Sequence, residues 1–310
     1  MSTRTQGRKI AFIGAAGQLG KPTITSLIAS GAGHNITAVQ RTDSTNTFPA
    51  GVIVKKGDLE DEAFLADVLR GQDALVLMPP LSHLVELQKP AIRAAAKVGV
   101  PYVFPSEYGP DPFATTLTNE NGLLQAKKGV RDLVDELKVS SWVSIVIGPW
   151  LDGGLQAGLW GIDAKARKAT IWKGAEGTVS SASIAHTGEA LAAALSLPEA
   201  ELAKYKNGAI YTPSFHFTQR ELLKAVQHAT GTTDANWDVQ VRDVSDMEKE
   251  YEAGIKAGDG MAPYVKFFLT HFLEGHGADL RSKVKPAEVA RLEQLGMGKE
   301  NMEEVIKATL

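Results

Sequence analysis

The feature that most constrains the fold is a regular alternation of short β-rich runs and helical patterns through the first 150 residues. The runs read KIAFIG, NITAVQR, VIVKKGD, DALVLMPP, PYVFPS and WVSIVIGPW, with helical patterns near residues 18–30, 60–69, 84–98 and 123–137. Strands that alternate with helices at this spacing join by right-handed crossovers into a parallel sheet. The runs AFIG, ALVLM and VSIVIG are almost continuously apolar, as strands covered on both faces are. The first half therefore predicts an α/β fold with a doubly wound parallel sheet.

After Trp150 this rhythm changes. ATIWKG, VSSASI and residues 208–213 have the pattern of short strands, and helical patterns lie at 189–195, 219–230, 247–257 and 264–274. Residues 286–310 predict one or two helices with a break at Gly296 and Gly298. We therefore predict one domain over residues 1–150. Residues 151–310 are expected to form a smaller substrate lobe that caps the carboxyl edge of the sheet, and interleaving of this lobe with the sheet is left open.

Composition narrows the function classes. The 310 residues carry a net charge of -3 without a basic block, which argues against nucleic acid or anionic membranes as partners. No cysteine is present, so thiolate catalysis, disulfides and cysteine–zinc sites are excluded, and the seven histidines show no metal-ligand spacing. No apolar run reaches about 20 residues, and the polar start has no secretory pattern. We expect a cytoplasmic protein with a small-molecule partner and no metal.

Three glycines follow the first strand in GAAGQLG. Gly14 permits the tight turn, Gly17 allows a pyrophosphate to approach the backbone, and Gly20 allows the following helix to pack closely on the sheet. The strand–turn–helix context makes this a dinucleotide site of the Rossmann type, with the phosphates at the helix N-terminus. The same turn brings Ala16, Gln18 and Leu19 to the cofactor.

The end of the second strand bears on the choice of dinucleotide. Arg41 lies 21 residues after Gly20, where an acid is typical of NAD sites and an arginine suits the 2′-phosphate of NADP(H). Thr42 and Ser44 offer further hydrogen-bond donors, whereas Asp43 would favour NAD if the strand end shifted. We predict NADP(H).

Two further segments are expected at the cofactor. Asp58 follows the third strand and is placed near the adenine, although Asp58 with Asp61 also has the pattern of a helix cap. Met78, Pro79 and Pro80 end the fourth strand and are expected to form a rigid wall beside the nicotinamide ribose.

The segments GAAGQLG, PYVFPSEYG and AKKGVRDLVDEL resemble the NmrA-like and isoflavone-reductase-like branch of the atypical short-chain dehydrogenases. The matching residues are Pro105, Ser106, Glu107, Tyr108 and Gly109, and Lys127, Val130 and Arg131 of a K-x-x-V-R pattern. None of the six tyrosines is followed by a lysine four residues later, so the usual tyrosine acid of short-chain dehydrogenases is missing. The resemblance implies that Lys127 is the acid/base and that Pro105, Ser106, Glu107 and Lys127 contact the cofactor.

A lysine acts as a base near neutrality only when burial or a neighbouring cation lowers its pKa. Lys128 and the helix N-terminus are expected to act on Lys127 in this way. Lys128 itself remains an alternative for the catalytic position. A third possibility is that both lysines are solvated and have no catalytic role.

Several residues are candidates for the substrate pocket. They are His83, Tyr108, Trp150, Asp152, Trp160, Tyr264 and Phe268, with Phe267 and His271 as further wall candidates. The aromatic ones among them also fit the core of the second lobe. His186 stands where relatives tend to carry an acid, and we expect it to be structural.

Together these observations predict an NADPH-dependent reductase of an aromatic or conjugated small molecule in secondary metabolism. The alternative is an NADP(H)-binding protein without net redox chemistry. It would be either a redox-sensing regulator with a protein partner or a cyclase or condensation enzyme that uses the cofactor structurally.

Overall fold

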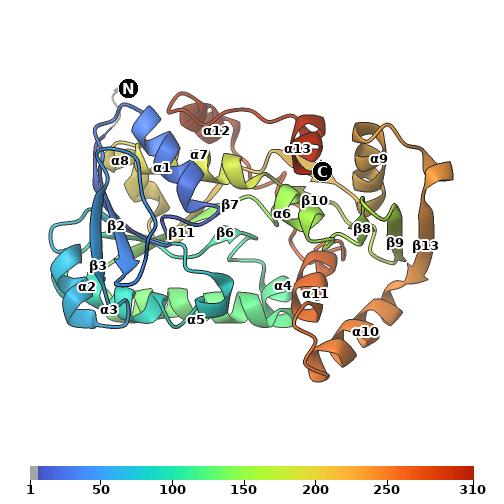
Figure 1. The fold of residues 1–310 in the computed structure, drawn as a ribbon, viewed down its shortest axis with the longest axis horizontal. Helices are drawn as coiled ribbons and strands as arrows, with labels where there is room; N and C mark the ends of the chain where they lie inside the picture. Colours follow the sequence, from blue (N-terminus) through green and yellow to red (C-terminus); the bar gives the residue numbers. More distant parts are fainter. Residues whose placement is uncertain (1–5) are drawn as a thin grey trace.

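The computed structural model describes residues 6–310, and its centre is one parallel β-sheet (Figure 1). The strand order is β11-β7-β5-β4-β1-β2-β3, with β6 beside β7. The strands are β1 (Lys9–Ile13), β2 (Asn35–Arg41), β3 (Ile53–Gly57), β4 (Ala74–Leu77), β5 (Tyr102–Phe104), β6 (Tyr108–Gly109), β7 (Ser141–Val146) and β11 (Gly208–Tyr211). All of these pairs are parallel, and the chain winds outward from β1 in both directions. This confirms the predicted α/β class and the parallel sheet.

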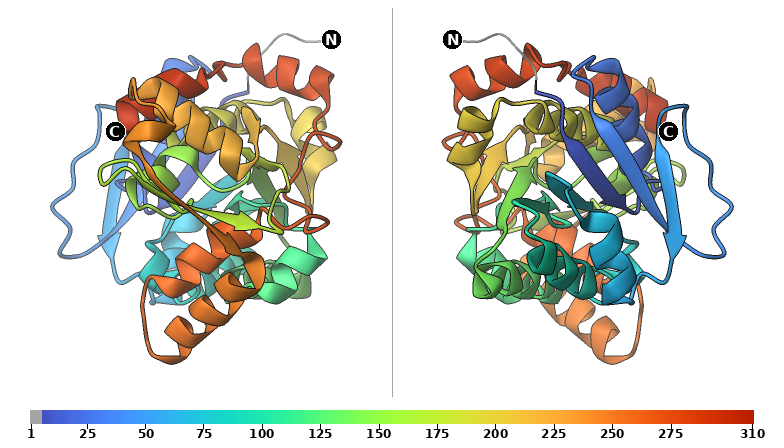
Figure 2. Two further views of the ribbon diagram at one scale, coloured as in Figure 1. Left: turned by 90° about the vertical axis from the view of Figure 1, so that its right-hand side faces the viewer. Right: turned by 90° about the vertical axis from the view of Figure 1, so that its left-hand side faces the viewer.

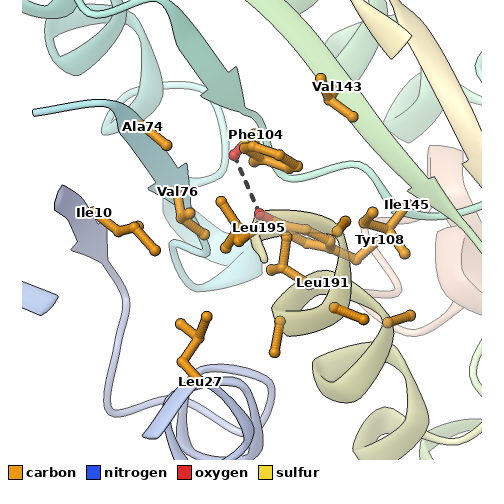
Figure 3. Close-up of a cluster of buried hydrophobic side chains, with 14 of the residues drawn as sticks. Ile10, Leu27, Ala74, Val76, Phe104, Tyr108, Val143, Ile145, Leu191 and Leu195 are labelled. Atoms are coloured by element: carbon orange, nitrogen blue, oxygen red, sulfur yellow. Dashed lines mark hydrogen bonds between the residues drawn. The ribbon is translucent and has the colours of Figure 1, made fainter. Parts of the chain in front are cut away.

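Helices cover both faces of the sheet, as Figure 2 shows. One layer holds α1 (Gly20–Ala29) and α7 (Ile184–Leu195), whose Leu27, Leu191 and Leu195 pack against Ile10 and Val76 of the sheet (Figure 3). The other layer holds α2 (Glu62–Leu69), α3 (Gln88–Val98) and α5 (Gly122–Leu137). Strands that helices cover on both faces need apolar side chains at successive positions. This explains the almost continuously apolar runs in the sequence.

The second lobe has a core of its own, to the right in Figure 1. It contains a three-stranded sheet of β8 (Ile162–Asp163), β9 (Lys168–Lys173) and β13 (Asp238–Asp243), and the pair β10 (Val179–Ser181) and β12 (Phe215–Phe217). Its helices are α4 (Thr115–Glu120), α6 (Leu151–Gln156), α9 (Gln219–Ala229), α10 (Val244–Lys256), α11 (Ala262–Thr270) and α13 (Met302–Thr309). Trp160 and Phe268 meet edge to face in this core, with ring centroids 4.7 Å apart.

The chain beyond residue 150 also returns to the first lobe. α7 packs on α1, and β11 extends the main sheet beside β7. α12 (Pro286–Glu293) packs on α7, and α8 (Glu199–Leu202) follows α7 in the chain. Residues 6–310 also contain three short 3-10 helices: Leu81–His83, Ala203–Tyr205 and Asp234–Asn236.

The start of α7 differs from the sequence expectation. VSSASI is a strand only through Ser181, because the hydroxyl of Ser183 accepts a hydrogen bond from the His186 amide at 3.0 Å and starts α7 five residues before the expected helix. The segment 286–310 contains two helices, the second of the two arrangements that the sequence allows. Within residues 6–310 no helix has the length and apolar character needed to cross a membrane.

Candidate functional site

A cavity of about 1020 Å³ runs along the carboxyl ends of β1, β2 and β4 and continues into the second lobe. This is the edge of a doubly wound sheet where ligands bind, at the point where the strand order reverses. One end is lined by the glycine turn and Arg41, and the other end by side chains of α11.

The glycine turn has the geometry that its sequence predicts. Gly14 has a φ of +89°, and a Cβ there would lie 1.9 Å from the carbonyl oxygen of Met78. A Cβ at Gly20 would lie 2.4 Å from the carbonyl oxygen of Ala15. At Gly17 an added Cβ would meet only the Gly14 carbonyl oxygen, at 3.2 Å, and this residue lines the cavity. The turn therefore leaves room beside Gly17 for a ligand to approach the backbone.

The helix after this turn fits an anionic group. α1 begins at Gly20, no side chain among the described residues caps its N-terminus, and its first turn has no acidic residue. The uncapped amides and the positive end of the helix dipole therefore favour a phosphate at the cavity. Ala16, Gln18 and Leu19 also line the cavity here.

Arg41 lines the cavity at the end of β2, and its side chain is exposed. Its Nε lies 3.6 Å from Oδ1 of Asp43, so the acid beside it pairs with the arginine and does not take its place. Ser44 and Asn46 line the cavity next to Arg41, whereas Thr42 is exposed and lies outside the lining.

Of the two other predicted cofactor segments, one lines the cavity and one does not. Met78, Pro79 and Pro80 line the cavity after β4. Asp58 lies outside the lining, because its carboxylate accepts a hydrogen bond from the Glu60 amide at 2.9 Å and closes the turn before α2. Leu59 and Glu60, which the sequence analysis does not single out, line the cavity in its place.

The two motifs of the family resemblance meet in a buried ion pair. Glu107, just before β6, accepts a hydrogen bond from the guanidinium of Arg131 in α5, and Arg131 also donates to the carbonyl of Pro112 at 3.2 Å. Pro105 and Glu107 are buried outside the cavity lining, whereas Ser106 lines it. The Ser106 amide donates to Oε1 of Gln88 at 2.8 Å, a partly buried contact that sequence reasoning missed.

Lys127 lines the cavity one helical turn before Arg131. Burial lowers the pKa of Lys127, the Arg131 guanidinium lowers it further, and the Glu107 carboxylate opposes the change. Lys128 is exposed and pairs with Asp132, with 2.7 Å between Nζ and Oδ2. The expected neighbouring cation was therefore assigned wrongly: Arg131, one turn away on the same helix face, faces Lys127, and Lys128 points elsewhere.

The far end of the cavity is apolar and aromatic. Tyr264, Phe267 and Phe268 of α11 line it with Trp150, and Met261, Leu123 and Leu159 add apolar surface. His83 lines the cavity near Pro80, and its Nδ1 lies 2.8 Å from the Ser82 hydroxyl. Met261, Leu123 and Leu159 carry no sequence signal, because apolar residues of the second lobe look alike whether they face a core or a cavity.

Four of the candidate pocket residues have side chains that are held by contacts in the core or between helices. The ring of Tyr108 reaches the cavity lining from the core, and its hydroxyl donates to the Phe104 carbonyl at 3.1 Å (Figure 3). Trp160 is fully buried and donates to the Leu151 carbonyl at 3.2 Å, so it is core and not pocket wall. Asp152 accepts from the Gly153 amide at 2.8 Å and the Ile184 amide at 3.1 Å, which joins α6 to α7, and burial raises its pKa. His271 is buried behind Phe267.

Comparison with known proteins agrees with this geometry. Residues 6–153 match the model of the NmrA-like family. The match covers the Rossmann part of the chain, which is similar to this family. Over nearly the whole length, the chain is 26% identical to "Oxidoreductase aprR" of Aspergillus flavus, covering 97% of this chain and 98% of that relative.

Two solved structures share the fold of this chain. AtPrR2 with NADP+ and (+)pinoresinol has a TM-score of 0.74 at 17% identity, covering 98% of this chain and 99% of that one. The isoflavone reductase structure also has a TM-score of 0.74, at 19% identity, covering 98% and 100%. The comparisons agree with the predicted family, the oxidoreductase class and NADP(H) as the cofactor.

Proposed function

We propose that this chain is an NADPH-dependent reductase of a neutral aromatic or conjugated small molecule, with Lys127 as the acid/base. The observation that carries the proposal is one continuous cavity with three parts. It has a phosphate-binding turn at one end, an aromatic wall at the other, and a lysine of lowered pKa in its lining.

The residues at the sheet edge fit a dinucleotide. Gly14, Gly17 and the N-terminus of α1 would hold the pyrophosphate, and Arg41 with Ser44 would hold the 2′-phosphate. Met78, Pro79 and Pro80 would bound the nicotinamide end. Reduced nicotinamide supplies a hydride when it is bound.

The protein's own contribution is positioning, exclusion of water and movement of a proton. The side chains of Tyr264, Phe267 and Phe268 offer apolar surface to a flat ring. Lys127, whose pKa burial lowers, would take a proton from a substrate oxygen or return one, directly or through one water. No other lysine, arginine, aspartate or glutamate in the described part of the chain lines this aromatic end, which favours an uncharged substrate.

The names of relatives support the same class. The chain is similar to an oxidoreductase of Aspergillus flavus and, over 44% of its length, to a probable pinoresinol-lariciresinol reductase of Arabidopsis thaliana at 28% identity. Secondary metabolism and a cytoplasmic location stay predictions that come from the sequence.

The test follows the absorbance of NADPH while the protein turns over a panel of neutral aromatic enones, quinones and benzylic ethers. One NADPH oxidised for each product molecule is the expected result. Product without NADPH oxidation would indicate the cyclase or condensation alternative, and tight NADPH binding without turnover of any compound would indicate the sensor. Either outcome would overturn the proposal.

A further inference from the structure

A second cavity, of about 250 Å³, lies between the first turn of α7, the loop that joins β11 to β12, and the connection from α12 to α13. Its polar lining residues are His186, Thr212, Ser214, Glu293, Lys299 and Glu300. It shares no lining residue with the cofactor cavity. α12 packs on α7 beside it (Figure 1).

Three of these residues carry a polar atom without a hydrogen-bond partner among the described residues. The atoms are Nδ1 of His186, Oγ1 of Thr212 and Oγ of Ser214. His186 is only 5% exposed and Thr212 only 1% exposed. Burying a polar group without a partner costs about 1–3 kcal/mol, so three in one cavity indicate a missing partner.

The tautomer of His186 follows from its other nitrogen. Nε2 lies 3.0 Å from the Thr212 carbonyl oxygen, which can only accept, so Nε2 carries a proton. When Nε2 carries the only proton of the ring, Nδ1 presents a lone pair, and it lies 3.9 Å from Oε2 of Glu300. A histidine whose second nitrogen donates to a backbone carbonyl is the arrangement that orients metal-bound imidazole.

The charges around the cavity favour a cation. Nζ of Lys299 lies 3.7 Å from Oε1 of Glu293, so these two charges pair with each other. Over residues 6–310, His186 is the only basic side chain within ion-pair distance of Glu300. The Ser183 amide donates to Oε2 of Glu300 at 3.2 Å and holds this carboxylate beside the ring.

We propose that this cavity binds one divalent metal ion of the zinc type, with Nδ1 of His186 and the Glu300 carboxylate as ligands. Zinc binds histidine nitrogen and carboxylate oxygen at about 2 Å each, and tetrahedral coordination places two such atoms about 3.3 Å apart, so the 3.9 Å between them would have to shorten slightly on binding. The hydroxyls of Ser214 and Thr212, directly or through water, complete the coordination. The ion would join the α12–α13 connection to α7. It would increase the stability of the fold and take no part in the reaction at Lys127.

Sequence reasoning predicted no metal, because His186 and Glu300 are 114 positions apart in the chain. In the described part of the chain no three His, Cys, Asp or Glu side chains are grouped to hold an ion. Since only two such side chains act here, we expect binding weaker than that of closed structural zinc sites, which have four protein ligands.

The test is a zinc titration of the full-length protein by equilibrium dialysis, with the melting temperature as a second readout. We expect one zinc per chain and a melting temperature that rises with zinc. H186Q and E300Q each remove a ligand and should weaken binding by at least about 10- to 100-fold, the loss seen when only an outer-shell partner of a ligand is removed. Acidification should also weaken it, because protons compete for the imidazole nitrogen.

Both variants are chosen to keep the fold. In H186Q the new side-chain amide can still donate to the Thr212 carbonyl, and in E300Q the new side-chain carbonyl can still accept from the Ser183 amide. Circular dichroism can check that each variant is folded. The matched control is H228Q, which removes an exposed histidine 3.4 Å from Glu303 and should leave the site unchanged. Absence of saturable binding, binding that H186Q and E300Q do not weaken, or binding that H228Q removes would each overturn the proposal.

Discussion

At the scale of single residues, Lys127 and Lys128 are neighbours in sequence with opposite surroundings. Lys127 lines the cavity and has a lowered pKa, whereas Lys128 is exposed and paired with Asp132. We expect Lys127→Ala to leave NADPH affinity nearly intact, because the phosphates are held by the glycine turn and Arg41. The catalytic rate constant should fall about 10²- to 10⁴-fold, the effect of losing a positioned proton-transfer group.

Lys128→Ala is the control and should change turnover little, because adjacent helix residues point about 100° apart. Steady-state kinetics and an NADPH binding titration measure both variants. A large loss with Lys128→Ala alone would move the catalytic position by one residue. No loss in either variant would remove lysine from the mechanism.

Arg41 is the residue that should separate NADPH from NADH. A hydrogen bond to a charged group contributes about 1.5–3 kcal/mol, so Arg41→Ala should weaken NADPH binding about 10- to 100-fold and NADH binding little. Thr42→Val is the matched control: Thr42 is exposed outside the lining, and its change should affect neither cofactor. Equal loss for both cofactors in Arg41→Ala would contradict the assignment to the 2′-phosphate.

The residues that could be found from sequence are those whose position follows from local backbone. Gly14 and Gly17 follow directly from a strand–turn–helix unit, and Pro79 follows a strand end, so spacing alone brings them to the cavity. Trp160 and Phe268 could not be separated in this way, because both are aromatic residues of one lobe. Only the tertiary packing, with one ring fully buried and the other at the cavity, distinguishes them.

At the scale of elements, the Glu107–Arg131 pair connects the start of β6 to α5 and so holds Lys127 beside the sheet edge. Arg131→Met leaves a buried carboxylate without a partner, and such losses cost about 3–5 kcal/mol. We expect that decrease in the free energy of unfolding, measured by urea denaturation. The double variant Glu107→Met/Arg131→Met should be less destabilised than Arg131→Met alone. A single variant within about 1 kcal/mol of the parent protein would show that the pair contributes little.

Element prediction was accurate where pairing is regular and local. The βαβ units have short loops and apolar strands, so the sequence pattern locates them. β8 has two residues and β13 is largely exposed, so neither carries a hydrophobic pattern that could be recognised. The early start of α7 did have a signal, Ser183 as its N-cap, which a search for capping residues before alanine-rich helices would have found.

At the scale of the whole molecule, the second half of the chain is built into the first. The Arg8 guanidinium donates to the carbonyls of Leu195 and Leu197 at the end of α7, at 2.5 and 2.6 Å. A Cβ at Gly188 of α7 would lie 2.9 Å from the Thr23 amide nitrogen in α1, so the two helices touch through their backbones. These contacts join α7 to α1 and to the residue before β1, although a domain boundary at residue 150 stays a prediction.

Two histidines, His34 partly buried and His271 fully buried, connect this packing to pH. His34 accepts from the Arg8 amide at 3.1 Å through Nδ1 and lies 3.0 Å from the Ser196 hydroxyl at the end of α7. His271 lies in the second lobe, with Nδ1 2.5 Å from the Phe267 carbonyl oxygen and Nε2 without a partner among the described residues. Burial lowers the pKa of each to about 4 from the ordinary 6.5.

Because the folded pKa values are depressed, the unfolded chain binds more protons between about pH 6.5 and 4, and stability falls as the pH falls through this window. For the fully buried His271 the loss at pH 5 is on the order of 2 kcal/mol. We expect His271→Gln to flatten this part of the profile of unfolding free energy against pH, measured by denaturant unfolding between about pH 8 and 4.5. The control H228Q removes an exposed imidazole and should leave the profile unchanged. If His271→Gln loses stability on acidification as steeply as the parent protein, other groups cause the acid sensitivity, and the buried neutral imidazole of the second lobe does not contribute to it.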